Sequence, residues 1–229
     1  MSANNNSNEN SELMGSLQVL DQLYHCKDIN ETKEFYANWA QDYEEDIEDM
    51  DYNGPQIVVK CFLELNCDRE SRILDIGAGT GVIGQLLARH GYHNVDGLDA
   101  SPKMLELAKQ KQCYTRLINS IVASNVRLPI DSRSYDVVIM AGVFCPGHIQ
   151  ADAFNEILRI TKSGGTICWA MGVTTIYADT DEHYRDGNFE RSIVQLCDKM
   201  KWLSILGYPK RVDNYVHGKD GWFHAMQVI

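Results

Sequence analysis

The run ILDIGAGTGVIG at residues 73–84 constrains the fold of this chain more than any other segment. An apolar run leads into a turn rich in glycine, and further apolar residues at helical spacing follow that turn. Gly79, Gly81 and Gly84 match the pattern G-x-G-x-x-G, in which glycines let the backbone approach a ligand at a helix N-terminus. The sequence therefore predicts a strand, a ligand-binding turn and a helix here.

Strands and helices alternate along the chain from Arg72 onward. Short apolar runs are separated by segments with helical spacing, and this alternation predicts a parallel sheet with helices on both faces. The last two strands are expected to pair antiparallel, because a turn signal, HGKDG, lies between them. The α/β fold predicted is thus a seven-stranded, mostly parallel sheet with an antiparallel last strand. The seven predicted strands lie within 72–77, 94–99, 115–124, 135–142, 166–172, 201–209 and 221–229.

The segment before the first strand is predicted to be helical and to cap the sheet. Residues 29–47 place aromatic and apolar side chains at spacings of three and four, which predicts one amphipathic helix. Pro55, following Asn53-Gly54, is expected at the first position of a second helix. The stripe of the first helix consists of Phe35, Tyr36, Trp39, Ala40, Tyr43 and Ile47.

Three parts of the chain follow from these patterns. Residues 1–12 are mostly Asn, Ser and Glu, and a segment with so little to bury is expected to be a disordered tail. Residues 13–70 form the predicted helical cap, and residues 71–229 form the predicted cofactor-binding domain.

Charge and cysteine content limit the partners of the chain. Its 229 residues carry a formal net charge of −11, so nucleic acid and anionic membrane surfaces are not expected to bind. The seven cysteines are an odd, scattered set without the spacing of a metal site, which indicates reduced thiols and no metal. We expect a cytoplasmic monomer, with the nucleus left open as a location, because we find neither a targeting segment nor a membrane span.

Two cofactors fit the glycine turn. Asp99 lies 20 residues after Gly79, the separation at which NAD-binding proteins place a ribose-binding acid. Asp75, two residues before Gly77, argues against NAD, because its carboxylate would repel a pyrophosphate and attract a ligand that carries an ammonium and a sulfonium. An NAD-dependent oxidoreductase stays the less favoured alternative.

The segment LDIGAGTG at residues 74–81 resembles the first motif of the class I S-adenosylmethionine-dependent methyltransferases, which have a Rossmann-like fold. The resemblance implies that this loop cradles the methionine end of S-adenosylmethionine, whose product is S-adenosylhomocysteine. GLDASPKML at 97–105 is similar to the second motif, which implies that Asp99 binds the ribose hydroxyls and that Ala100 and Met104 line the adenine. The first motif contributes Asp75, Gly77, Ala78, Gly79 and Gly81.

Residues 124–142 are similar to the family segment that passes the adenine edge and leads into the fourth strand. The resemblance implies that Ser124, Asn125, Val126 and Ala141 lie beside the cofactor. Members usually carry an acid a few residues before the Leu-Pro pair, and this chain has Ser124 there. Its hydroxyl, the Asn125 amide or a backbone group is then expected to bind the adenine amino group. LRITKSGGTICWAM at 158–171 resembles the helix and fifth strand that close the core.

A closer resemblance is to the methyltransferase-like protein 27 group, through FY-x-x-WA-x-x-Y at 35–43 and AGVFCPGHI at 141–149. The aromatic stripe fits two interpretations, a core contact or a lid over the cofactor. As a lid, Tyr36, Trp39 and Tyr43 would line the cofactor, with the two tyrosine hydroxyls on its carboxylate. His148 is a candidate base, as is Tyr43, although a loop histidine is more often simply exposed.

These patterns predict an enzyme that moves a methyl group from S-adenosylmethionine to a small-molecule acceptor. No base is obligatory, because the sulfonium already makes the methyl group electrophilic. A protein acceptor stays open, as does a protein that binds the cofactor without transferring its methyl group.

Overall fold

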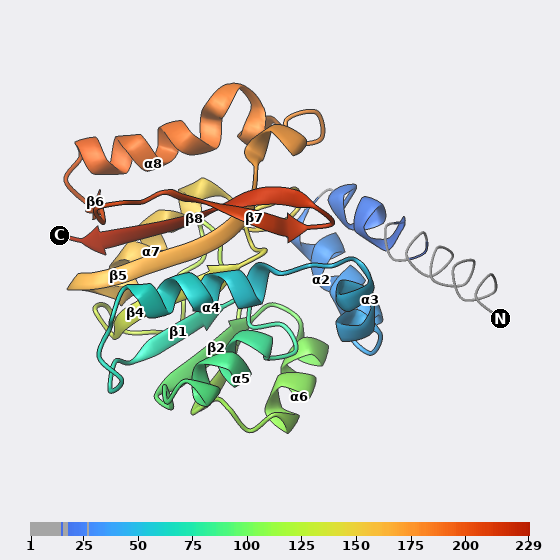
Figure 1. Cartoon of the computed structure of the whole chain (residues 1–229), viewed down its shortest axis with the longest axis horizontal. Helices are drawn as coiled ribbons and strands as arrows, with labels where there is room; N and C mark the ends of the chain where they lie inside the picture. The colour runs from blue at the N-terminus through green and yellow to red at the C-terminus, as the bar shows by residue number, and fades with distance from the viewer. Residues whose placement is uncertain (1–14, 16–17, 27) are drawn as a thin grey trace.

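The computed structural model describes Gly15, residues 18–26 and residues 28–229 (Figure 1). The tail predicted at residues 1–12 and the first residues of the predicted cap lie outside the described residues. No described helix is both long enough and apolar enough to cross a lipid bilayer.

The described residues form one eight-stranded sheet in the order β3-β2-β1-β4-β5-β8-β6, with β7 also paired to β8. Strands β1 to β5 run parallel, and β8 lies antiparallel between β5 and β6. The predicted α/β fold with an antiparallel last strand is confirmed. The strands are β1 (Ile73–Ile76), β2 (Val95–Asp99), β3 (Arg116–Asn119), β4 (Tyr135–Ala141), β5 (Thr161–Gly172), β6 (Trp202–Ser204), β7 (Lys210–Val216) and β8 (Lys219–Val228).

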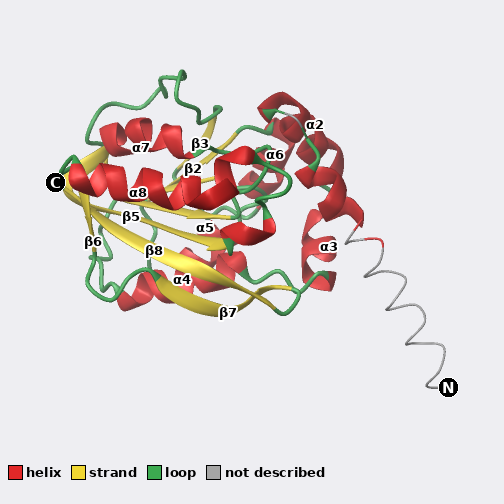
Figure 2. Cartoon of the chain, turned by 90° about the horizontal axis from the view of Figure 1, so that it is seen from above, coloured by secondary structure: helices red, strands yellow, loops and turns green. Residues whose placement is uncertain are grey.

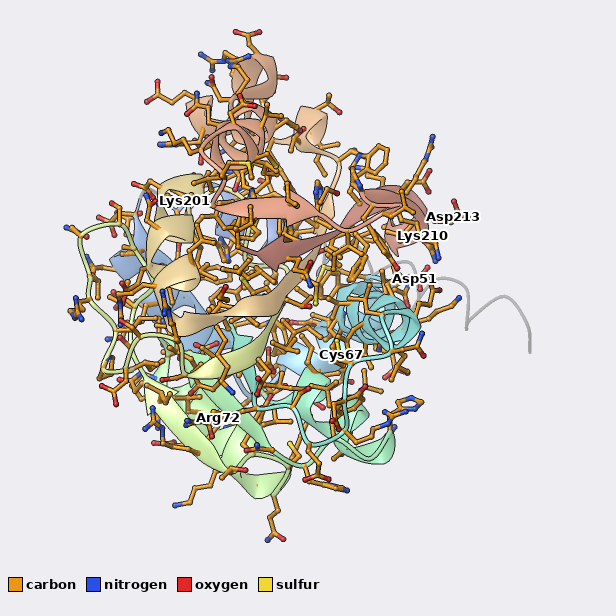
Figure 3. The ribbon with its side chains drawn as sticks, turned by 90° about the vertical axis from the view of Figure 1, so that its left-hand side faces the viewer. Asp51, Cys67, Arg72, Lys201, Lys210 and Asp213 are labelled. Carbon is orange, nitrogen blue, oxygen red and sulfur yellow. The ribbon has the colours of Figure 1, made fainter. Side chains whose placement is uncertain are left out.

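The outer edge of the sheet holds one strand more than the seven expected. Strand β8 is long enough to pair with β6 through Trp202 and Val228, and with β7 through Lys210 and Phe223. The segment predicted as one strand at 201–209 forms only β6, and a turn separates it from β7. Lys210, labelled in Figure 3, also reaches Glu64 of α4 at 2.8 Å, which ties this edge to a helix on the sheet.

Helices cover both faces of the sheet (Figure 2). The apolar residues of β4 alternate between the two faces: Val137 and Ile139 pack with α4 and α5, whereas Val138 and Met140 pack with α7 and α8. This period of two is the pattern of a strand buried on both sides. The helices are α2 (Ile29–Trp39), α3 (Tyr43–Asp49), α4 (Gly54–Glu64), α5 (Val82–Arg89), α6 (Pro102–Gln110), α7 (Phe154–Ile160) and α8 (Asn188–Asp198).

The single helix expected at 29–47 is instead two helices, α2 and α3, preceded by a helical segment at 18–24. Asp28 caps α2 by accepting from the backbone N–H groups of Asn30 and Glu31. The first turn of α3 holds three acids, Glu44 to Asp46, which favour a new helix N-terminus at this point. These helices lie beside the carboxyl ends of the parallel strands, whereas α4 packs on the sheet itself.

Candidate active site

A cavity lies where β1, β2 and β4 end, beneath α2 and α3. The carboxyl ends of parallel strands are where open α/β sheets hold their ligands. Among the residues predicted to bind the cofactor or act in catalysis, this cavity is lined by Gly77, Gly79, Asp99, Ala100, Met104, Ala141, Tyr36, Trp39, Tyr43 and His148.

The glycine turn forms one wall of the cavity with its backbone. Gly77 has φ +76°, and a Cβ there would lie 2.3 Å from Cγ1 of Val143, so a side chain would clash. At Gly79, with φ +53°, the atom nearest to an added Cβ would be the carbonyl oxygen of Gly77 at 3.9 Å. Gly79 therefore leaves room for a ligand where any other residue would place a side chain.

Asp99 ends β2 at the mouth of this turn. Its Oδ2 accepts from the backbone N–H of Gly79 at 2.9 Å, and its Oδ1 accepts from the N–H of Ser101 at 2.8 Å. Burial raises the pKa of Asp99, while these two donors act in the opposite direction. Each carboxylate oxygen keeps a lone pair for a further donor, so the group can accept from two neighbouring hydroxyls.

Asp75 lies behind the turn and does not line the cavity. It is fully buried, its Oδ2 accepts from the hydroxyl of Tyr114 at 2.6 Å, and its Oδ1 has no hydrogen-bond partner. Burial raises the pKa of Asp75 to about 7. The direct charge pair with a ligand ammonium that the sequence suggested is therefore not offered by this geometry. Instead, Tyr114 links Asp75 to the first turn of α5, because its oxygen also accepts from the N–H of Gly84 at 3.2 Å.

Helices α2 and α3 form a lid over the cavity, and Tyr36 of α2 joins this lid to His148, which follows β4. The Tyr36 hydroxyl lies 2.9 Å from Nε2 of His148, and Nδ1 of His148 lies 2.8 Å from the carbonyl oxygen of Pro146. Burial lowers the pKa of His148 to about 4, so the imidazole is neutral near pH 7. A neutral imidazole of such low basicity is a weak proton acceptor, which makes it better suited to positioning Tyr36 than to general base catalysis.

The aromatic stripe lines the cavity and also packs within the lid. The rings of Trp39 and Tyr43 lie 4.8 Å apart edge to face, and Tyr36 stacks on Trp39 at 5.8 Å. The stripe therefore has core contacts and also faces the cavity, and its role as a lid over the cofactor stays a prediction. Burial raises the pKa of Tyr43 well above the usual range.

Four tyrosines of the cavity wall were missed from the sequence. Tyr52 follows α3, Tyr177 follows β5 and Tyr215 lies in the unexpected strand β7, so they come from distant parts of the chain. Tyr24 meets Tyr177 edge to face at 5.4 Å, and Tyr52 meets Tyr215 likewise at 5.4 Å. No local signal marks Tyr215, because β7 itself was not predicted and forms by pairing with β8.

The predicted adenine segment lies farther out than expected. Asn125 and Val126 do not line the cavity, nor do Ala78 and Gly81, and Ser124 lines a second, neighbouring cavity. Ser120 and Val122 line the main cavity instead. Ser120 directly follows β3, so the carboxyl end of this strand was the signal for it.

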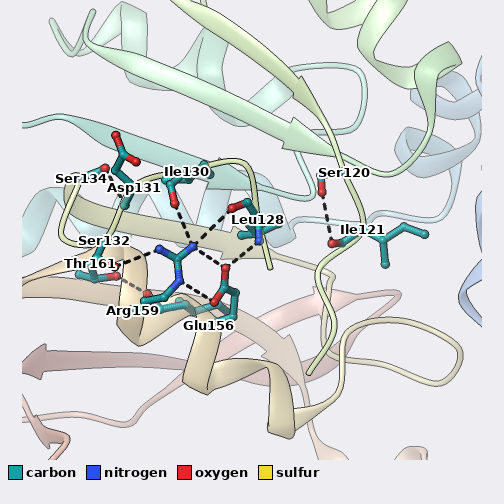
Figure 4. A network of polar contacts seen from close by, with 11 residues as sticks. Ser120, Ile121, Leu128, Ile130, Asp131, Ser132, Ser134, Glu156, Arg159 and Thr161 are labelled. Atoms are coloured by element: carbon teal, nitrogen blue, oxygen red, sulfur yellow. Dashed lines mark hydrogen bonds and ion pairs between the residues drawn. The ribbon is translucent and has the colours of Figure 1, made fainter. Parts of the chain in front are cut away.

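A network around Arg159 of α7 holds the loop that leads to β4 (Figure 4). The guanidinium donates to Glu156 at 2.6 Å and to the carbonyl oxygen of Ile130 at 2.9 Å. Glu156 in turn accepts from the N–H of Leu128 at 2.7 Å. The loop after the predicted adenine segment is thus fixed by charge-assisted hydrogen bonds.

Comparisons with known proteins agree with this geometry. A protein-family model described as a methyltransferase domain matches residues 74–169. Residues 74–169 are a methyltransferase domain, and the fold is that of a solved SAM-dependent methyltransferase. The antiparallel β8 between β5 and β6 also separates this domain from the NAD-binding fold, whose strand order is 3-2-1-4-5-6.

Relatives of the methyltransferase domain extend the match over most of the chain. Methyltransferase-like protein 27 of Homo sapiens is 28% identical over 184 residues, covering 80% of this chain and 72% of that protein. Demethylmenaquinone methyltransferase of Tropheryma whipplei is 27% identical over 162 residues, covering 67% of this chain and 64% of that protein. The crystal structure of a TehB-like SAM-dependent methyltransferase from Corynebacterium glutamicum superposes with a TM-score of 0.58 at 18% identity, covering 85% and 98% of the two chains.

Proposed function

We propose that this protein transfers a methyl group from S-adenosylmethionine to a small, largely apolar acceptor inside the cavity. One observation carries the proposal: the glycine turn and Asp99 at one end of the cavity are continuous with an aromatic end covered by α2 and α3. The polar end suits a cofactor with ribose and amino acid groups, and the aromatic end suits an acceptor.

The residues present fit the cofactor. Gly79 leaves open the space that a side chain would fill, and its N–H holds the Asp99 carboxylate in place. Asp99 would accept from the ribose hydroxyls, while Ala100 and Met104 would contact the adenine. When bound, S-adenosylmethionine supplies a methyl group made electrophilic by its sulfonium. The residues of the chain then have to align the acceptor and exclude water.

The lid provides the exclusion of water. Thr32 of α2 donates to the carbonyl oxygen of Gly147 at 2.7 Å, and Lys111 at the end of α6 reaches Glu44 of α3 at 2.6 Å. These contacts and the Tyr36–His148 bond tie α2 to the loop after β4 and α3 to the end of α6. A molecule of moderate size fits beneath such a lid, whereas a folded protein or a nucleic acid does not.

A relative supports an acceptor of this kind. The name of the Tropheryma whipplei protein identifies its substrate as demethylmenaquinone, which is neither a protein nor a nucleic acid. The formal net charge of −11 also disfavours a nucleic acid. We propose by analogy a small acceptor for this chain as well.

Thermal unfolding with four ligands tests the cofactor directly. S-adenosylmethionine, S-adenosylhomocysteine, NAD and NADH are each added at about a hundred times a plausible Kd, where a bound ligand adds about 2.7 kcal/mol and raises the midpoint by roughly 5–10 °C. We expect a shift with the two adenosyl ligands only. A shift with NAD alone would overturn the proposal, and binding without transfer to any acceptor would leave a cofactor-binding protein without transferase activity.

A further inference from the structure

The hydroxyl protons of Tyr36 and Tyr52, two tyrosines of the cavity wall, are already committed to partners within the protein. The Pro146 carbonyl can only accept, so Nδ1 of His148, 2.8 Å away, carries the ring proton. Nε2 is then an acceptor, and Tyr36 donates its hydroxyl proton to it at 2.9 Å. The Tyr36 oxygen has only lone pairs left to offer to a molecule in the cavity.

Tyr52 and Tyr215 form a second chain of the same kind. Tyr215 donates to the carbonyl oxygen of Ala170 at 3.3 Å, so the proton between the two tyrosines, 3.3 Å apart, comes from Tyr52. The Tyr52 oxygen lies over the end of β4, where a Cβ on Gly142 would be 2.4 Å from it. Tyr52, like Tyr36, therefore faces the cavity as an acceptor of hydrogen bonds.

A second cavity adjoins the first, and the two share Tyr24, Ile29, Val122 and His148 in their walls. Its lining includes four carboxylates, and no Lys or Arg among the residues that the structure describes. Two histidines, His25 and His183, are also present there. The carboxylates are Asp28, Asp152, Asp181 and Glu182. The described lining holds no Lys or Arg to offset these four carboxylates, so a cation is attracted toward the shared wall.

We propose that the methyl acceptor is a small primary or secondary amine, admitted through the second cavity and bound beside Tyr36 and Tyr52. This inference rests on the proposed function. An amine donates N–H bonds to the two phenol oxygens, and its charged form is attracted to aromatic faces and to the carboxylates outside. A carboxylate would meet only hydrogen-bond acceptors at these two tyrosines, so it would bind there less well than an amine. Lys33 is the one cation in the described wall of the main cavity.

The transfer balances without a further reactant. The ammonium first gives one proton to solvent, so the amine reacts as the free base. Its nitrogen lone pair forms the new N–C bond as the S–C bond breaks, and the electron pair of that bond stays on sulfur. The positive charge passes from sulfur to the methylated nitrogen, which leaves as an ammonium.

Binding to the protein saturated with S-adenosylhomocysteine tests the proposal. The probes are two isosteric sets: phenethylamine, 2-phenylethanol and phenylacetate, and hexylamine, hexanol and hexanoate. Calorimetry is expected to show at least tenfold tighter binding of the amine in each set. Equal or tighter binding of an alcohol or acid, or no binding of either amine, overturns the amine proposal. Failure of S-adenosylhomocysteine itself to bind would instead overturn the proposed function.

Two substitutions test the placement and the entry of the amine: Tyr52→Phe and Asp181→Asn. Tyr52→Phe keeps the ring and removes the oxygen, so amine binding should weaken about fivefold or more while S-adenosylhomocysteine binding is unchanged. Tyr208→Phe, at a half-buried tyrosine packed on Phe223 outside the cavity, is the matched control. Asp181→Asn in the second cavity should slow amine association in low salt, with little effect in high salt. Unchanged amine binding in Tyr52→Phe would contradict the placement of the amine.

Discussion

The hydroxyl of Tyr36 on α2 and Nε2 of His148, which follows β4, lie 2.9 Å apart and join the lid to the sheet. Tyr36→Phe leaves Nε2 without a partner in a buried position, which costs about 1–3 kcal/mol. We expect this loss in the free energy of unfolding, measured with urea. Tyr208→Phe serves as the control because, among the residues that the structure describes, none forms a hydrogen bond with its hydroxyl, and the side chain is half-buried. Equal stability of the two variants would show that the lid does not depend on this bond.

Asp75 should make stability fall as the pH rises. Its pKa in the folded protein is raised to about 7, against 3.8 for the ordinary carboxyl group, so the folded state binds more protons between these two values. Stability from the protonated group is thus present at low pH and is lost as the pH rises toward 7 and beyond.

Asp75→Asn removes this titration and keeps an acceptor for Tyr114. The free energy of unfolding of the variant minus that of wild type should therefore rise by about 2–4 kcal/mol from pH 4 to pH 8, measured by urea unfolding without ligand. Asp131→Asn, at an exposed loop position, is the control. A difference between Asp75→Asn and wild type that does not change with pH would show that the carboxyl group does not titrate in this range.

The sequence predicted the sheet because local signals coincided there. The glycines of the first turn, Ser101 as the cap of α6 and the apolar runs of β1, β2 and β4 each carry their structure in a few residues. Strand β7 was missed because its segment KRVDNYV is charged and polar, and only pairing with β8 makes it a strand.

The cavity wall was predicted only where a motif marks it. Gly77 and Gly79 lie in the turn after β1 and Asp99 ends β2, so their place at the sheet edge follows from the topology. Tyr52, Tyr177 and Tyr215 meet only through tertiary packing of three distant segments. Asp75 does not line the cavity, and its Oδ2 instead accepts from the hydroxyl of Tyr114, which lies 39 residues later in the chain.

Asp99→Asn should weaken binding of S-adenosylhomocysteine about 10- to 100-fold, because a charged acceptor for two ribose hydroxyls becomes a neutral group with one acceptor. Titration calorimetry measures the loss, and Asp131→Asn is again the control. Unchanged binding in Asp99→Asn would remove this residue from the cofactor site.

Glu44→Gln should loosen the lid with little effect on overall stability. The pair with Lys111 is half exposed at Glu44, so it contributes only about 0–1 kcal/mol to global unfolding. Hydrogen exchange of the α3 amides should nevertheless be about two- to fivefold faster in the variant, because the pair ties this helix to α6. Lys103→Gln, which breaks the exposed pair with Glu106 on α6, should leave α3 unchanged. Unaltered exchange in Glu44→Gln would show that the pair does not hold the lid.

Arg159→Lys should destabilise the loop before β4, although it keeps the positive charge. A planar guanidinium donates to Glu156 and to the carbonyl oxygen of Ile130 at the same time, and an ammonium lacks this fork. The arginine is largely buried, with 17% of its side chain exposed, so about 1–3 kcal/mol of unfolding free energy should be lost. Limited proteolysis should cut first within residues 124–134. Arg116→Lys, at an exposed position on β3, is the control. If both variants resist protease equally, the loop is held by its apolar contacts at Leu128 and Ile130 rather than by the guanidinium.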